Sequence, residues 1–301
     1  MARIGIIDTR WTIDGEITYL GASAEGLLMN VRMVNSTFED RNRTDLDSDA
    51  NTDTFISRIP EYASHGVKAF TLCLQGGMPG YEGALNSGYD PDGSLRPTYI
   101  DRVERVIRAS SENGVAIILS CFYQRQDQIF PDAGAIRNAL TNTVNWIGDR
   151  KFDHVVLEVA NEHAHRGFTH EIIRRPDGQV ELIGLAKELN PELLTTTSGM
   201  GSGRVEEQIA EAGDFIIIHF NTTSFDDVAD RIEAQKQFGK PIVCNEDVKL
   251  RKRGAEVASL CVDHGCSWGL MHADLNQNVP FEFNGAADDP DVYTRLKELT
   301  R

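Results

Sequence analysis

The sequence predicts an α/β protein, a (β/α)8 TIM barrel with an N-terminal β-hairpin. Short apolar segments alternate with amphipathic segments along the chain, which is typical of a parallel sheet with helical crossovers. Eight such strand–helix units can be found, the number that closes a barrel. A doubly wound open sheet is the alternative, but no G-x-G-x-x-G fingerprint follows the first predicted strand. We therefore expect residues 1–301 to form one barrel domain.

The N-terminal segment is expected to form a hairpin before the barrel begins. Residues 10–20 alternate around Asp14-Gly15, and an Asp-Gly pair is a strong signal for a tight turn between two strands. We expect residues 1–18, which contain this turn, to close the bottom of the barrel. The first barrel strand is predicted to follow near residues 19–23.

The other elements follow from apolar runs and from the Gly, Pro and Asn residues that bound them. The loop over residues 78–97 is long and rich in Gly and Pro, which is uncommon unless a loop is functional or disordered. The predicted strands cover residues 68–74, 115–121, 154–160, 193–197, 214–219, 241–244 and 267–271. The predicted helices cover residues 52–64, 98–113, 133–147, 180–189, 205–212, 226–238, 255–264 and 291–299.

Composition excludes several classes of protein. The formal net charge of −16 would repel a polyanion, so nucleic-acid binding is not expected. Apolar runs stay well below the roughly 18 residues of a membrane span, and the N-terminus lacks the apolar stretch of a signal peptide. We expect a soluble protein without a membrane partner, either cytoplasmic or secreted after loss of a leader. The five scattered cysteines indicate reduced core residues rather than a disulfide framework.

Two carboxylates that follow buried strands are the strongest candidates for catalysis. Residues 154–160 lead into Asn161-Glu162, and residues 241–244 lead into Asn245-Glu246. Because the C-terminal strand ends of a barrel converge at one mouth, we expect Glu162 and Glu246 to meet there. Such a pair is what glycoside hydrolysis requires, since one group protonates the leaving oxygen while the other acts as nucleophile or base.

Other polar and aromatic residues at predicted strand ends suit a carbohydrate ligand. Amide side chains can hydrogen-bond sugar hydroxyls, and an aromatic face can stack on a sugar ring. We expect the partner to be an oligosaccharide, a polysaccharide or a small glycoside, with no metal or organic cofactor required. The candidate substrate-binding residues at these strand ends are Gln75, Tyr123, Gln124, Asn161, His163, His219, Asn221, Trp268 and His272.

These motifs make the chain resemble the retaining (β/α)8-barrel glycoside hydrolases, and in particular the cellulase-like glycoside hydrolase family 5 and its relatives. Glu158-Val159-Ala160-Asn161-Glu162 is similar to the strand-four signature of that clan, and residues 241–246 are similar to its strand-seven segment. Residues 11–23 resemble the opening hairpin and first strand, and Ser267-Trp268-Gly269 resembles the strand-eight region.

The resemblance implies separate roles for these residues. Glu162 would be the acid/base and Glu246 the nucleophile of a double displacement at a β-glycosidic bond. Asn161 would bind the sugar 2-hydroxyl. His219 would lie near the nucleophile, and Arg32 would stand beside it.

The sequence departs from the clan pattern at positions near the expected substrate. His163 follows Glu162 where a Pro is common, and Tyr123-Gln124 stands where many members have a His. Strand eight continues as far as His272, so either Trp268 or His272 could form the platform under the sugar.

Two other functions remain open on the sequence alone. A metal-dependent barrel hydrolase or isomerase could use Glu162, His163 and Glu246 together with His272, because imidazole and carboxylate groups are common metal ligands. A non-catalytic carbohydrate-binding barrel would keep the cleft without turnover.

Overall fold

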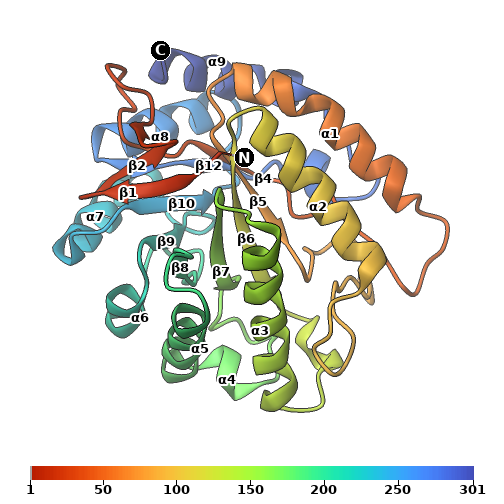
Figure 1. Ribbon diagram of the computed structural model, residues 1–301. Coiled ribbons are helices and arrows are strands. Elements are labelled where there is room, and N and C mark those ends of the chain that lie inside the picture. Colours follow the sequence, from red (N-terminus) through yellow and green to blue (C-terminus); the bar gives the residue numbers. More distant parts are fainter. Residues whose placement is uncertain (1) are drawn as a thin grey trace.

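The computed structural model describes residues 2–301 and consists of a ring of parallel strands enclosed by helices (Figure 1). β11 and β12 are the two halves of one strand, interrupted at Trp268. The barrel strands are β4 (Asn30–Arg32), β5 (Ala69–Cys73), β6 (Ala116–Phe122), β7 (Val155–Ala160), β8 (Thr195–Thr196), β9 (Ile216–His219), β10 (Ile242–Glu246), β11 (Cys266–Ser267) and β12 (Gly269–Leu270).

Backbone pairing closes these strands into a barrel. β12, β4, β5, β6, β7 and β8 form one sheet in that order, and β11, β10 and β9 form another. A parallel bridge between Ser198 and Ile217 links β8 to β9, and a second between Asp247 and Leu270 links β10 to β12. The predicted (β/α)8 TIM barrel is therefore confirmed.

Helices pack around the outside of the strands (Figure 1). Several begin where the sequence supplies a cap: the side chains of Asp47, Asp132 and Asp289 accept hydrogen bonds from first-turn N–H groups. None of the helices within residues 2–301 has the length and apolar character needed to span a membrane. The helices are α1 (Ser48–Ser64), α2 (Pro97–Glu112), α3 (Ala133–Arg150), α4 (Glu171–Arg174), α5 (Pro176–Leu189), α6 (Glu207–Ala212), α7 (Phe225–Gln235), α8 (Arg251–Asp263) and α9 (Pro290–Leu299), with short helical turns η1 (Asp127–Ile129), η2 (Lys236–Phe238), η3 (Ala273–Gln277) and η4 (Gly285–Asp288).

The predicted N-terminal hairpin is present and covers the bottom of the barrel. β1 (Ile4–Ile7), β2 (Arg10–Ile13) and β3 (Glu16–Ile17) form an antiparallel sheet, and the β2–β3 turn is made by Asp14 and Gly15, both at positive φ. The side chains of Ile4 and Trp11 pack in one cluster with the first residues of the barrel strands.

The first barrel strand lies further along the chain than predicted. Residues 19–23 form turns, and Tyr19 and Gly21 both adopt positive φ, outside the β region of a regular strand. The strand is β4 instead, in which Asn30 and Arg32 are fully buried. Because two of its three residues are polar, this strand lacks the apolar run by which the other strands are predicted.

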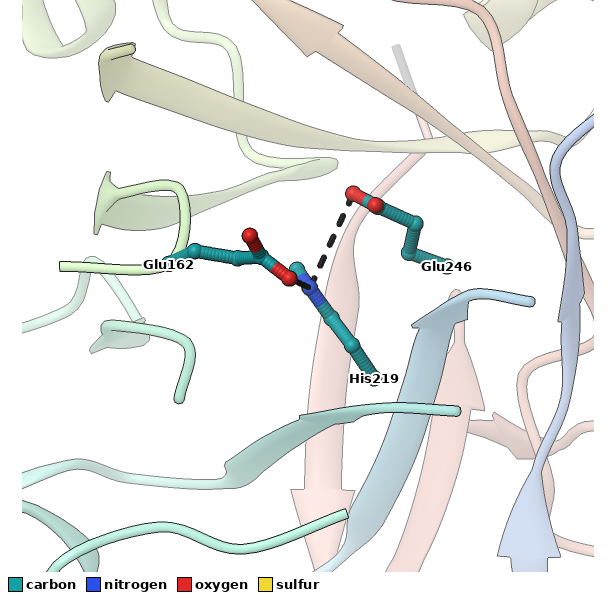
Figure 2. A group of neighbouring side chains, drawn as sticks. All are labelled: Glu162, His219 and Glu246. Carbon is teal, nitrogen blue, oxygen red and sulfur yellow. Dashed lines mark hydrogen bonds and ion pairs between the residues drawn. The ribbon is translucent and has the colours of Figure 1, made fainter. Parts of the chain in front are cut away.

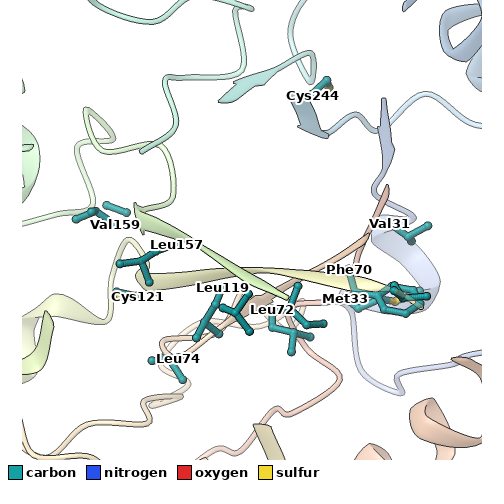
Figure 3. Close-up of a cluster of buried hydrophobic side chains, with 14 of the residues drawn as sticks. Val31, Met33, Phe70, Leu72, Leu74, Leu119, Cys121, Leu157, Val159 and Cys244 are labelled. Atoms are coloured by element: carbon teal, nitrogen blue, oxygen red, sulfur yellow. The ribbon is translucent and has the colours of Figure 1, made fainter. Parts of the chain in front are cut away.

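The core has two layers that follow the alternation of each strand. Residues such as Ala69, Ile118, Val156 and Val243 belong to the cluster that also contains the bottom hairpin. The alternate residues pack between the strands and the outer helices, as Figure 3 shows for side chains of β4 to β7 and β10. All five cysteines are buried and free, in agreement with the prediction of reduced core residues.

We expect the Trp11→Ala variant to lose about 3–5 kcal/mol of unfolding free energy, because a large buried ring is replaced by a cavity at the barrel bottom. Trp11 is fully buried, and its ring centroid lies 5.2 Å from that of Phe215. Urea denaturation followed by circular dichroism measures the loss. Leu20→Ala is the control, since Leu20 is 71% exposed and should change stability by less than about 0.5 kcal/mol. A Trp11→Ala loss below about 1 kcal/mol would contradict this role.

Candidate active site

Glu162 sits directly after β7, on a turn that points it into the barrel mouth. Its φ is 48°, in the left-handed region that a non-glycine residue rarely adopts. The backbone N–H of Glu162 donates to Ser198 Oγ at 2.8 Å, which ties the turn to the end of β8. The sequence places this carboxylate at a strand end, but the turn that aims it is visible only in the structure.

Glu246 ends β10, where the pairing with β9 is irregular. The register shifts between Cys244 and Glu246, so Glu246 lies opposite His219. Arg32 Nε lies 3.0 Å from Glu246 Oε2, and Asn221 Nδ2 donates to Glu246 Oε1. One carboxylate therefore receives a fully buried guanidinium on one side and an amide on the other.

His219 lies between the two carboxylates (Figure 2). Its Nδ1 is 3.2 Å from Glu162 Oε1 and 3.6 Å from Glu246 Oε2. Because an ionised carboxylate can only accept a hydrogen bond, Nδ1 carries the proton. One ligand atom from each of Glu162, His219 and Glu246 lies within 4.8 Å of the others, so the two carboxylates meet as the strand-end pattern predicts.

The electrostatics of these groups are coupled. Burial lowers the pKa of His219, but the charge of Glu246 and the hydrogen bond to Glu162 outweigh it and raise the pKa above its ordinary value. Burial raises the pKa of Glu162, yet the hydrogen bond and charge of His219 bring it below its ordinary value. Without a bound substrate, these pKa shifts therefore favour a proton on the His219 imidazole and a negative charge on Glu162.

Amide and aromatic side chains frame Arg32. Its Nη2 donates to Asn161 Oδ1 at 2.8 Å, and Asn161 Nδ2 donates to Gln124 Oε1 at 3.1 Å. The guanidinium carbon also lies 5.9 Å from the centroid of the Tyr123 ring. The structure thus gathers Arg32, Asn161, Gln124 and Tyr123 with His219, Asn221 and the two carboxylates at one mouth.

Below this mouth the barrel interior contains a third carboxylate. Glu158 is fully buried on β7, and Asn245 Nδ2 approaches its Oε2 at 3.5 Å. Burial raises the pKa of Glu158, although the charges of Arg32 and His219 oppose this. Burial therefore shifts Glu158 toward its neutral form.

Two of the candidate substrate-binding residues point away from the mouth, which corrects the prediction. The His163 ring is turned outward because its Nδ1 lies 3.2 Å from the Arg174 carbonyl and its Nε2 lies 3.1 Å from Glu206 Oε2. Trp268 is fully buried in the layer between strands and helices, where its Nε1 donates to Asp247 Oδ2 at 2.9 Å. Trp268 cannot form a sugar platform from that position.

Two other candidates serve the loops. Gln75 is fully buried, and its amide donates to the Gln126 carbonyl and accepts from the Tyr123 N–H. His272 is partly buried and caps η3, where its Nδ1 accepts from the Leu275 N–H at 3.4 Å. Their side-chain groups are thus engaged in holding the loops around the mouth.

One pair of residues at the mouth is missing from the sequence prediction. Asn35 follows β4, and its Nδ2 donates to the carbonyl of Gln277, which ends η3. Correct placement of the first strand would have drawn attention to Asn35 as a strand-end amide. No spacing in the sequence links it to Gln277.

Comparison with solved structures places this geometry in a known fold. An endoglucanase of group GH5-4 from Clostridium longisporum covers 91% of this chain and 96% of its own, at 14% identity and a TM-score of 0.60. The chain has the cellulase-like barrel fold of glycoside hydrolase family 5. A β-mannanase from the blue mussel Mytilus edulis shares this family 5 fold, covering 98% of this chain and 96% of its own at 12% identity and a TM-score of 0.60.

Two further structures share this barrel fold. A candidate glycoside hydrolase from Bacteroides vulgatus has a TM-score of 0.68 at 11% identity, and the match spans 98% of this chain but only 60% of that one. ZgEngA of group GH5_4, solved with a cellotriose, has a TM-score of 0.61 at 15% identity and covers 93% of this chain and 98% of its own. No sequence family and no curated protein matches this chain. The resemblance drawn from the strand motifs is thus confirmed for the fold.

We expect the pKa of His219 to exceed the ordinary value of about 6.5, because two carboxylates stabilise the imidazolium. Exchange of Glu162 or Glu246 for Gln should lower it. Since folding raises this pKa, the associated stability is fully present below about pH 6.5 and is lost as pH rises through the raised value. NMR titration of the imidazole measures the shift. His264, which pairs with Glu233 on the surface, should not respond and is the internal control. An unchanged His219 pKa in both variants would contradict this coupling.

Proposed function

We propose that this protein is a retaining glycoside hydrolase that cleaves a β-glycosidic bond by double displacement. The observation that carries the proposal is the carboxylate pair, Glu162 and Glu246, of which one oxygen each lies within 4.8 Å of the other at the mouth of the barrel. Retaining enzymes hold their two carboxyl groups about 5–5.5 Å apart, whereas inverting enzymes need about 6.5–9.5 Å to admit a water. The short separation favours direct attack by one carboxylate.

Glu246 is the better nucleophile of the two. Arg32 and Asn221 contact its two oxygens, which fixes the orientation of the carboxylate. In the first step a Glu246 oxygen bonds to the anomeric carbon while the bond to the leaving oxygen breaks, and the leaving oxygen takes a proton. The ester so formed is the covalent intermediate.

Glu162 is placed to supply and recover that proton. Its Oε1 accepts a hydrogen bond from His219 Nδ1 at 3.2 Å, so the imidazolium proton passes through Glu162 to the leaving oxygen although the pKa of Glu162 is lowered. After the leaving group departs, Glu162 removes a proton from the incoming water. The water oxygen then displaces Glu246 from the anomeric carbon and releases the sugar with its configuration retained.

The amide groups of Asn161, Gln124 and Asn221 at the mouth support a carbohydrate as substrate, because amides hydrogen-bond sugar hydroxyls. The ZgEngA structure holds a cellotriose, and other family 5 neighbours are endoglucanases and mannanases, which supports a β-linked oligosaccharide or polysaccharide. Asn161 is oriented by Arg32 and Gln124, so its amide is fixed beside the expected position of the sugar 2-hydroxyl.

A metal-dependent reaction remains the second candidate, because Glu162, His219 and Glu246 could together hold a cation. The guanidinium of Arg32, 3.0 Å from Glu246, opposes a second positive charge there. We therefore expect hydrolysis to persist unchanged after dialysis against EDTA, as measured by initial rates on the same glycoside. Loss of activity on chelation and its return with added zinc or magnesium would favour the metal-dependent reaction instead.

The Glu246→Ala and Glu162→Ala variants should lose activity in different ways. Removal of the nucleophile should reduce kcat on any glycoside by at least about 10⁴-fold. Removal of the acid/base should reduce kcat by about 10²–10⁴-fold. This second loss should be smallest with a dinitrophenyl glycoside, because its leaving group needs no proton. Azide should restore turnover of both, giving the β-glycosyl azide with Glu162→Ala and the α-glycosyl azide with Glu246→Ala.

The matched control is Glu192→Ala, since Glu192 is an exposed carboxylate paired with Arg3 outside the mouth and should leave kcat unchanged. Wild-type activity in both catalytic-site variants would exclude the mechanism. A mechanism-based fluoroglycoside that fails to label Glu246 in an otherwise folded protein would favour a non-catalytic carbohydrate-binding barrel.

A further inference from the structure

His163 joins the turn at Glu162 to two other segments of the chain. Its ring is fully buried, with Nδ1 3.2 Å from the Arg174 carbonyl oxygen at the end of α4 and Nε2 3.1 Å from Oε2 of Glu206, directly before α6. We name His163, the Arg174 carbonyl and Glu206 the His163 clamp. The clamp holds three segments together beside the proposed acid/base.

Both ring nitrogens of His163 face groups that accept hydrogen bonds. A carbonyl oxygen and an ionised carboxylate cannot donate, so a neutral imidazole, which has a single N–H, satisfies only one of them. The ring satisfies both acceptors when each nitrogen carries a proton. The hydrogen bond from His163 also lowers the pKa of Glu206, which favours the ionised carboxylate as acceptor. The clamp therefore contains a charge-assisted hydrogen bond, which is stronger than a neutral one.

Residues 198–206, which we name the β8 loop, are held at both ends by Glu162 and His163. At the start of the loop, Ser198 Oγ accepts from the Glu162 N–H at 2.8 Å, and the Ser198 carbonyl accepts from the His163 N–H at 3.3 Å. At its end, the Glu206 carboxylate accepts from the His163 ring. Loss of the clamp would therefore free the far end of the loop while its start stayed attached.

The β8 loop also contacts the proposed catalytic groups. A Cβ on Gly201 would stand 3.5 Å from Glu162 Oε1, so the loop backbone lies against this carboxylate. The same oxygen accepts the hydrogen bond from His219 (Figure 2). The Gly203 N–H donates to the His219 carbonyl at 2.8 Å. Displacement of the loop would therefore open space beside Glu162 and remove a backbone contact of His219.

The conformation of Glu162 requires such support. Its φ of 48° lies in the left-handed region, where a non-glycine residue is strained and stays only if its surroundings enforce the conformation. The contacts of Ser198 and His163 supply this restraint on both sides of the turn. Relaxation of the turn would move the carboxylate, and a misplacement of about 1 Å can reduce a rate about 100-fold.

We propose that His163 is a positioning residue: through Glu206 and the Arg174 carbonyl it holds the β8 loop and the turn that place Glu162 at the leaving oxygen. This inference rests on the proposed function, because it takes Glu162 as the acid/base. Since its ring points away from the mouth, His163 acts through Glu162 and not on the sugar. Protonation of the leaving oxygen should therefore depend on Glu206.

The Glu206→Ala variant tests the proposal, because the Glu206 side chain is 42% exposed and its removal leaves the buried ring in place. The probes are the phenyl and 2,4-dinitrophenyl β-glycosides of cellobiose and mannobiose. We expect kcat/KM for the phenyl glycoside to fall at least about tenfold, because departure of phenol needs a proton from a correctly placed acid. The value for the dinitrophenyl glycoside, whose leaving group needs no proton, should change less than about twofold.

Two further variants provide the controls. Glu207→Ala removes the next carboxylate of the chain, which is exposed in the first turn of α6, and should leave kcat/KM unchanged with both glycosides. Glu206→Gln keeps an oxygen that can accept from His163 Nε2, so its kcat/KM for the phenyl glycoside should lie closer to wild type than to Glu206→Ala. Equal losses with both glycosides, or full phenyl glycoside activity in folded Glu206→Ala, would overturn the positioning role.

Amide hydrogen exchange gives a second readout that does not depend on activity. Peptides from the β8 loop should exchange faster in Glu206→Ala than in the wild type or in Glu207→Ala, because the far end of the loop is freed. Unchanged exchange would overturn the clamp even if the protein hydrolyses the probes. If the wild type hydrolyses none of them and a fluoroglycoside does not label Glu246, the proposed function fails, together with the positioning role that rests on it.

Discussion

A buried guanidinium is the interaction on which the rest of this site depends. Arg32 is fully buried at the end of β4 and binds Glu246 and Asn161, which belong to strands elsewhere in the ring. An unpaired charge in such a place is costly, and removal of one partner from a buried pair typically costs about 3–5 kcal/mol. Arg32 and Glu246 therefore require each other. The Asn161 amide and the Glu246 carboxylate are both positioned by this one side chain.

The barrel divides into a lower half that supports the fold and an upper half that carries charge. The lower interior is filled by Ile118, Val156 and Val243 and sealed by Trp11. The upper interior holds Glu158 and Asn245 below Glu162 and Glu246. Burial raises the pKa of Glu158, which weakens its competition with Glu246 for the charge of Arg32. The two halves can thus vary separately, one for stability and the other for chemistry.

The sequence predicts the parts of this protein in which apolar periodicity is strong. β5, β6, β7 and α3 lie close to their expected positions, and the strand-end rule brings Glu162 and Glu246 together before any coordinates are considered. Prediction from the sequence fails where polar residues are buried, as in β4, because their partners are distant in the chain. The prediction also fails for His163 and Trp268, because hydrogen bonds to Glu206 and Asp247, and not the local sequence pattern, set the orientation of these two side chains.

The left-handed turn at Glu162 has a consequence for how such a protein changes over time. A non-glycine residue in this conformation stores about 1–3 kcal/mol of backbone strain, which Gly or Asn would relieve. Replacement of Glu162 by either would therefore be favoured by selection for stability and opposed only by selection for turnover. If the proposed hydrolase function holds, a lineage that no longer needs the reaction has at this position a short, energetically favourable path to a stable barrel without catalysis.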